Sequence, residues 1–361
     1  MSNEKRLAEI RDQIDSLDAQ IQELISARAR CAQEVAEVKQ AAGQEVVFYR
    51  PEREASILRN IQERNAGPLS NEEIARLFRE IISACLALEE VLKIAFLGPE
   101  GTFTQAAALK HFGHSVETVS LSDINEVFRE VESGNAHYGV VPVENSTEGV
   151  VSHTLDMFMT TNLKICGEVE LRIHHHLMSK QNEMSGIEKV YSHQQSLGQC
   201  RKWLDANLPN VERIAVSSNA EAARLAMSEP TSAAIAGDSA AALYQLDILA
   251  PNIEDEPDNT TRFLIIGRQA VGPSGHDKTS LLCATDNRVG SLHHLLSPLV
   301  ENQISMTRIE SRPSRRGMWD YVFFIDIEGH ASSPDIKSAL EHLQKETSLF
   351  KVLGSYPRAV L

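Results

Sequence analysis

Long apolar runs are absent from this 361-residue chain, and no segment is apolar enough to cross a bilayer. The first residues, MSNEKRLAEIRDQ, also lack the apolar core of a secretory signal peptide. The five cysteines are scattered without the spacing of metal ligands, which is typical of reduced thiols. We therefore expect a cytoplasmic protein with no membrane partner.

Positive charge is also in short supply. The chain has 35 Lys and Arg against 50 Asp and Glu, and the formal net charge of -15 argues against nucleic acid as a partner. An anionic substrate would need cations concentrated at one place. Hydrophobic residues make up 42% of the chain and charged residues 24%, as in soluble globular proteins, and the length predicts two or three domains.

An apolar seam with alternating three- and four-residue spacing predicts a long N-terminal helix packed against other helices. An arginine, Arg28, occupies one position of the seam, where an unpaired guanidinium is costly. Arg28 therefore either extends its head to water along an apolar stem or binds an anion. The apolar members are Leu7, Ile10, Ile14, Leu17, Ile21, Leu24, Cys31, Val35 and Val38.

Two further cations lie on the same helix. Lys39 is roughly 20° from Arg28 around the helix axis, whereas Arg11 is about 100° away. One straight helix cannot easily aim all three at one small ligand. A two-fold pair of helices can, if Arg11 reaches into the site of the other copy. The pattern predicts a homodimer, or a higher homo-oligomer, with shared anion sites.

Residues 1–92 are predicted to be all helical. The first helix ends at about Gly43, and the second begins near Pro51. The third follows a capping box of Ser70 and Glu73 and runs to about Leu92.

The second and third helices add site candidates. Arg53 and Glu54 adjoin on the second, and Cys85 and Glu89 share one face of the third. A small dianion with an ether or hydroxyl oxygen would suit this set. Alternatively, Glu89 is a solvated surface residue and Cys85 fills the core.

These 92 residues resemble the helical chorismate mutase family. The resemblance implies an intertwined dimer in which Arg11 of one subunit and Arg28 of the other bind the carboxylates of chorismate. It also implies that Lys39 contacts the ether oxygen, that Arg53 assists, and that Glu54 engages the ring hydroxyl. Cys85 and Glu89 stand where the best-known bacterial pattern has Ser and Gln.

Residues 93–271 alternate strands and helices in two blocks, which predicts a two-lobed α/β domain with a cleft between the lobes. Four loops rich in Gly, Ser, Thr and Asn suit carboxylates at a cleft mouth. They are Gly98-Pro99-Glu100-Gly101-Thr102-Phe103-Thr104, Pro142-Val143-Glu144-Asn145-Ser146-Thr147-Glu148-Gly149, Ser192-His193-Gln194-Gln195-Ser196-Leu197-Gly198-Gln199-Cys200 and Thr260-Thr261-Arg262-Phe263.

The four loops resemble those of prephenate dehydratases, which implies a fold like that of periplasmic binding proteins. The resemblance makes Thr261 catalytic, as a proton donor to the departing ring hydroxyl. Arg262 is either a carboxylate binder or a structural ion-pair partner, and His193 is a site candidate with a possible structural role. The substrate-binding candidates are Thr102, Asn145, Ser146, Thr147, Ser192, Gln194 and Arg262.

A metal site is not expected. His174, His175 and His176 are consecutive, and in an extended segment neighbouring side chains face opposite sides. Neither implied reaction needs a metal or redox cofactor, so we expect no cofactor.

A linker at 272–278 leads to a βαββαβ pattern over 277–361, which predicts a ferredoxin-like sandwich. Its motifs resemble those of ACT domains that bind phenylalanine. They are Glu310-Ser311-Arg312-Pro313 and, more loosely, Gly290-Ser291-Leu292-His293. The alternative is a plain dimerisation sandwich.

Taken together, the chain resembles bifunctional chorismate mutase–prephenate dehydratases. The resemblance implies conversion of chorismate to prephenate and of prephenate to phenylpyruvate, with feedback inhibition by phenylalanine. A non-catalytic anion or amino-acid sensor, or a chain with one activity intact, are the alternatives.

Overall fold

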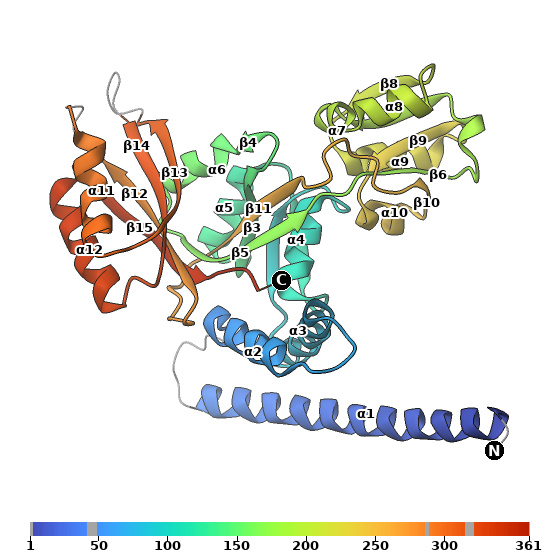
Figure 1. Ribbon diagram of the computed structural model, residues 1–361, viewed down its shortest axis with the longest axis horizontal. Coiled ribbons are helices and arrows are strands. Elements are labelled where there is room, and N and C mark those ends of the chain that lie inside the picture. Colours follow the sequence, from blue (N-terminus) through green and yellow to red (C-terminus); the bar gives the residue numbers. More distant parts are fainter. Residues whose placement is uncertain (1–2, 42–48, 286–288, 315–320, 361) are drawn as a thin grey trace.

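The computed structural model describes residues 3–41, 49–285, 289–314 and 321–360 (Figure 1). Its N-terminal region consists of α1 (Asn3–Ala41), α2 (Pro51–Arg64) and α3 (Asn71–Ala87). The predicted end of the first helix, Gly43, lies outside the described residues. None of the described helices has the length and apolar character needed to span a membrane.

The ends of α3 follow from local chemistry. The hydroxyl of Ser70 accepts a 3.1 Å hydrogen bond from the backbone amide of Glu73, which caps the helix. The expected end near Leu92 was wrong, because the helix stops at Ala87. The chain must turn there to enter β1, where Ile94 is fully buried.

The first lobe of the middle region is built on a sheet with strand order β2-β1-β3-β11-β5, and β4 pairs with β3. Strand β11 runs antiparallel to both β3 and β5. The elements are β1 (Lys93–Leu97), α4 (Phe103–Phe112), β2 (Glu117–Leu121), α5 (Ile124–Ser133), β3 (Tyr138–Asn145), β4 (Gly149–Val150), α6 (Ser152–Phe158), β5 (Lys164–Arg172) and β11 (Thr260–Gly267).

The second lobe has its own sheet, with strand order β10-β6-β9-β7-β8. The chain enters this lobe after β5 and returns before β11, so two crossings join the lobes (Figure 1). The elements are β6 (His176–Ser179), η1 (Met184–Gly186), β7 (Lys189–His193), α7 (Gln194–Gln199), α8 (Arg201–Asn207), β8 (Glu212–Val216), α9 (Asn219–Ser228), β9 (Ser232–Ala236), α10 (Asp238–Tyr244) and β10 (Asp247–Ala250).

The C-terminal region is a sheet of strand order β13-β14-β12-β15 with two helices on one face, the ferredoxin-like arrangement that the sequence predicts (Figure 1). Its strand β15 packs against β5 of the first lobe. The elements are β12 (Asp277–Ala284), α11 (Ser291–Glu301), β13 (Met306–Pro313), β14 (Tyr321–Glu328), α12 (Pro334–Glu346) and β15 (Leu349–Pro357).

Candidate functional sites

The helical region brings Lys39 and Glu89 together. The ammonium of Lys39 lies 3.8 Å from a Glu89 carboxylate oxygen, and the Glu89 side chain is only 9% exposed. Glu89 lies in the turn that follows α3, so its expected place on that helix is corrected. The turn nevertheless keeps it near Cys85, which is buried.

The environment of Glu89 sets its protonation. Burial raises the pKa of this carboxyl above its usual value, while Lys39 and Arg28 lower it. One Glu89 oxygen is buried without a hydrogen bond within the described residues. Two cations and a carboxyl with a raised pKa therefore converge at the C-terminal half of α1.

The apolar seam of α1 is exposed from Leu7 to Leu24. Leu7, Ile14 and Leu24 are 49%, 50% and 69% exposed in the single chain. Arg11 is also exposed, and it lies about 25 Å from Arg28 along the helix axis at 1.5 Å per residue. Arg11 cannot reach the Lys39 site of its own chain while α1 is straight.

Glu54 on α2 is buried in an ion pair with Arg79 of α3, 2.7 Å between charged atoms. Burial raises the pKa of Glu54, against the opposing influences of Arg79, a hydrogen bond from Tyr49, and Arg28. Arg79 was not singled out from the sequence, since one arginine on a helix is an ordinary surface feature. Arg53 is exposed on α2.

A cleft of about 320 Å³ lies between the two lobes. Thr102, Asn145 and Thr261 line it, and so does His193 at the end of β7. The Thr102 hydroxyl donates 2.9 Å to the carbonyl of Pro99. The four sequence-predicted loops thus meet at one cavity.

Thr261 is fixed by a hydrogen bond from the neighbouring strand. The Asn145 side-chain amide donates to Thr261 Oγ1 at 2.8 Å and to Asn259 Oδ1 at 2.7 Å. Asn145 Oδ1 in turn accepts from the hydroxyl of Thr147 at 2.7 Å. Because Thr261 Oγ1 accepts from Asn145, its own proton is available to a ligand in the cleft.

Three cleft residues were missed as sites by the sequence analysis. Gln199 Oε1 accepts from Asn259 at 3.3 Å and lies 2.9 Å from His175 Nε2. His175 is buried, and burial lowers its pKa, which favours the neutral ring. The available signals were that Gln199 lies within one predicted loop and that Asn259 directly precedes another.

Each of the consecutive histidines His174, His175 and His176 has its own polar contact. His174 lies 2.8 Å from Glu254, and His176 lies 3.1 Å from Asp238. The first contact joins the two crossings between the lobes, and the second lies within the second lobe. Among the described residues, no group of three or more His, Cys, Asp or Glu is arranged to hold a metal ion.

Besides Arg262, four predicted substrate binders do not line the cleft. Ser192 is fully buried and donates to the carbonyl of Ile235 at 2.8 Å, because it alternates with His193 along β7. Gln194 begins α7 but is not among the cleft-lining residues, whereas Gln195 is. Ser146 and Thr147 support the loop rather than line it, and Ser146 Oγ accepts from the Thr260 amide at 3.0 Å.

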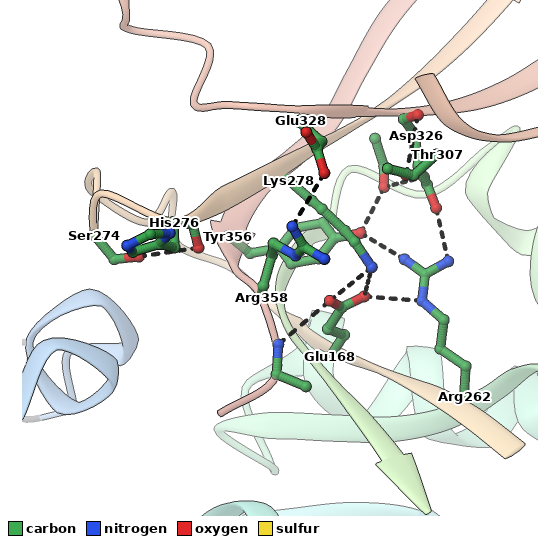
Figure 2. Close-up of polar contacts among 12 residues, drawn as sticks. Glu168, Arg262, Ser274, His276, Lys278, Thr307, Asp326, Glu328, Tyr356 and Arg358 are labelled. Carbon is green, nitrogen blue, oxygen red and sulfur yellow. Dashed lines mark hydrogen bonds and ion pairs between the residues drawn. The ribbon is translucent and has the colours of Figure 1, made fainter. Parts of the chain in front are cut away.

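Arg262 does not line the cleft, so the expectation that it binds substrate is corrected. Figure 2 shows its guanidinium directed at Glu168 and Asp326. Arg262 follows Thr261 on β11 and therefore faces the opposite side of the sheet. Its guanidinium pairs with Glu168 of β5 at 2.9 Å and with Asp326 of β14 at 2.7 Å. Of the two roles left open by the sequence, the structure gives the ion-pair partner.

The two motifs of the C-terminal region lie at one end of its sheet. Gly290 precedes α11 in a left-handed conformation, and Ser291 and Leu292 begin that helix. Glu310, Ser311 and Arg312 lie near the end of β13. Arg312 pairs with Asp156 of α6 at 2.8 Å, which links this motif to the first lobe.

Comparison with protein families assigns the three regions in order. The model described as chorismate mutase type II matches residues 10–90, prephenate dehydratase matches 94–271, and the ACT domain matches 279–343. A protein of Stutzerimonas stutzeri named bifunctional chorismate mutase/prephenate dehydratase is 61% identical, over 100% of both chains. The chain belongs to this bifunctional family.

Further comparisons agree with this family assignment. A protein of the same name from Pseudomonas aeruginosa is 60% identical over 100% of both chains. The crystal structure of a prephenate dehydratase from Arthrobacter aurescens in complex with L-Phe is 34% identical, with a TM-score of 0.69. That match covers 74% of this chain and 90% of the other. The predicted fold is confirmed: a helical mutase domain, a two-lobed α/β dehydratase domain and an ACT domain.

Proposed function

We propose that the helical region converts chorismate to prephenate at a site shared by two copies of the chain. Lys39 stabilises the negative charge that develops on the ether oxygen as the C–O bond breaks and a C–C bond forms. Arg28 of the same chain and Arg11 of the second copy bind the two carboxylates. The proposal is supported by the pairing of Lys39 with Glu89 and by the exposed seam of α1.

The rest of the first site follows from the same arrangement. A protonated Glu89 donates a hydrogen bond to the ether oxygen, with Cys85 packed behind it. Glu54 binds the ring hydroxyl while held by Arg79, and Arg53 adds positive charge at the rim. Because the rearrangement is intramolecular, the protein needs only to hold the compact conformer and stabilise the developing charge.

The cleft then converts prephenate to phenylpyruvate, carbon dioxide and water. Thr261 donates its proton to the departing ring hydroxyl while the carboxylate leaves as carbon dioxide, and the ring becomes aromatic. Thr102 and Asn145 position the substrate, and Thr147 orients Asn145. The observation that carries this proposal is the 2.8 Å hydrogen bond from Asn145, which leaves the Thr261 proton free.

Phenylalanine is proposed to bind the ACT domain and inhibit the dehydratase. The binding residues are Gly290, Ser291 and Leu292 before and in α11, with Glu310, Ser311 and Arg312 on β13. The complex of L-Phe with the Arthrobacter aurescens enzyme supports this choice of effector. We further propose that the enzyme is a cytoplasmic homodimer or higher homo-oligomer.

A direct assay tests the proposal. Purified protein is mixed with chorismate, and prephenate and phenylpyruvate are followed with and without phenylalanine. We expect phenylpyruvate to form and phenylalanine to reduce its rate. Binding of chorismate or phenylalanine without any product would instead indicate a sensor. Formation of prephenate alone would indicate that only the mutase is active.

A further inference from the structure

The reverse face of the catalytic strands carries a second pair of residues. Thr261 and Asn145 are direct cross-strand partners on β11 and β3, and the next pair is Arg262 and Glu144. Because side chains alternate along a strand, the first pair faces the cleft and the second faces the ACT domain. The two pairs share one stretch of backbone, so a displacement of one displaces the other.

The ACT domain meets this second pair with a pair of its own. Arg308 of β13 and Asp326 of β14 are direct cross-strand partners in the ACT sheet. Arg308 Nε lies 3.0 Å from Glu144, and Arg262 Nη1 lies 2.7 Å from Asp326. We name these four residues (Glu144, Arg262, Arg308 and Asp326) the interdomain quartet.

The charged side chains of the quartet are mostly buried between the domains. The side chains of Arg262 and Arg308 are each 12% exposed and that of Asp326 is 7% exposed, so these three charges are largely removed from water, whereas Glu144 is 39% exposed. Removing one partner of such a pair leaves a buried charge without compensation, which makes the contact sensitive to small displacements. Tyr356 of β15 adds a 3.0 Å contact to Arg262 and fixes its orientation (Figure 2).

The quartet also adjoins the proposed phenylalanine site. Arg308 and the motif residues Glu310 and Arg312 lie on the same strand, β13, with alternate side chains on the same face. A ligand that moves the end of β13 would therefore move Arg308 and its partner Glu144. The contact of Lys164 with the carbonyl of Val352, which also joins the domains, lies away from the cleft pair.

We propose that the interdomain quartet couples the ACT domain to the dehydratase site, with Arg262 and Glu144 as positioning residues for Thr261 and Asn145. The inference rests on the proposed roles of Thr261 and of phenylalanine. Phenylalanine weakens the ion pair of Arg308 with Glu144, which allows the β3–β11 strand pair to shift. The hydroxyl of Thr261 is then no longer aligned with the substrate. Prephenate, by reciprocity, weakens phenylalanine binding.

The test measures this coupling directly. In a Thr261→Ala background, which leaves prephenate unconverted, phenylalanine is titrated calorimetrically with and without saturating prephenate. The ratio of the two dissociation constants is the coupling factor, for which about tenfold is typical. It is measured for Glu144→Gln, Arg308→Met and the double variant, with Arg308→Lys as the conservative replacement. Lys164→Met is the matched control, because it removes a different interdomain contact.

We expect a coupling factor near one in both single variants and in the double variant. The coupling factor of Arg308→Lys should lie between one and the parent value, and that of Lys164→Met should equal the parent value. A double variant no worse than either single variant identifies the two residues as one unit. An unchanged factor in Glu144→Gln and Arg308→Met would overturn the inference, and so would an equal loss in Lys164→Met. If the Thr261→Ala parent binds phenylalanine with the same dissociation constant in the presence and absence of prephenate, the proposed role of phenylalanine as an effector is wrong, and the inference that rests on it is overturned with it. The same substitutions are also made in a chain that keeps Thr261, and retained mutase activity in these proteins shows that each variant is folded.

Discussion

Asn145 donates a 2.8 Å hydrogen bond to Thr261 Oγ1, its direct partner across the β3–β11 pair. An aspartate has the same shape but only accepts when ionised. Asn145→Asp should therefore draw the Thr261 proton away from the substrate. We expect kcat for prephenate to fall by about a hundredfold or more, the size of a lost general acid.

Mutase activity of Asn145→Asp serves as the folding control and should be unchanged. Thr261→Ser, which keeps the hydroxyl, should retain much more dehydratase activity than Asn145→Asp. Full activity in Asn145→Asp would mean that the direction of this hydrogen bond has no part in catalysis.

The mutase should lose activity as the pH rises. Burial raises the pKa of Glu89, which keeps the carboxyl protonated to higher pH than an ordinary glutamate. Above that pKa, Glu89 ionises, loses its donor and repels the charge on the ether oxygen. Glu89→Gln donates at any pH, so its pH profile should be flatter and its activity higher in neutral and alkaline solution.

The comparison needs chorismate turnover across the pH range for both proteins, with prephenate turnover as the control. The dehydratase profile should not respond to Glu89→Gln. Mutase profiles of the same shape in the two proteins would remove Glu89 from the neighbourhood of the ether oxygen.

A shared mutase site can be tested by mixing inactive subunits. Arg11→Ala and Lys39→Ala should each abolish most mutase activity alone. Unfolding and refolding them together should restore about a quarter of wild-type activity, since half the dimers are mixed and each has one intact site of two. No recovery in a refolded mixture with full dehydratase activity would place Arg11 in its own chain's site or outside any site.

Gly354 allows β15 to approach β5 closely. A Cβ at this position would overlap the carbonyl oxygen of Ile165 and lie 2.8 Å from its amide nitrogen, and neither backbone atom can move aside easily. Gly354→Ala should lower the free energy of unfolding by about 1–3 kcal/mol, as overpacked sites do. It should also weaken phenylalanine inhibition. Urea unfolding measures the free energy of unfolding, and dehydratase assays with increasing phenylalanine measure the inhibition. If neither quantity changes, the close contact of β15 with β5 contributes neither to stability nor to inhibition.

Regular patterns made the fold predictable from the sequence. The seam from Leu7 to Val38, the capping box at Ser70 and the strand–helix alternation are local signals, and each fixes an element by itself. The loops around Thr102, Asn145 and Thr261 could be grouped because turn residues end strands at one edge of a sheet. Where a helix ends depended on the strand that follows, which is why the end at Ala87 was missed.

Side-chain direction was harder to predict. Arg262 and Ser192 stand beside cleft residues, and a shift of one position along a strand turns a side chain to the other face. Asn259 and His175 joined the site through contacts with Gln199, which depend on the packing of the two lobes. A single sequence does not report such long-range contacts, and the same holds for the ion pair of Glu54 with Arg79.

We propose that two separate sites act in sequence on one chain, and Thr261→Ala distinguishes the two sites with a single substitution. The substitution removes the proposed proton donor of the cleft and leaves the helical site untouched. With chorismate as the substrate, we expect prephenate to accumulate at the wild-type rate and no phenylpyruvate to form. Phenylpyruvate formation at an undiminished rate, or loss of both reactions in a folded protein, would contradict it.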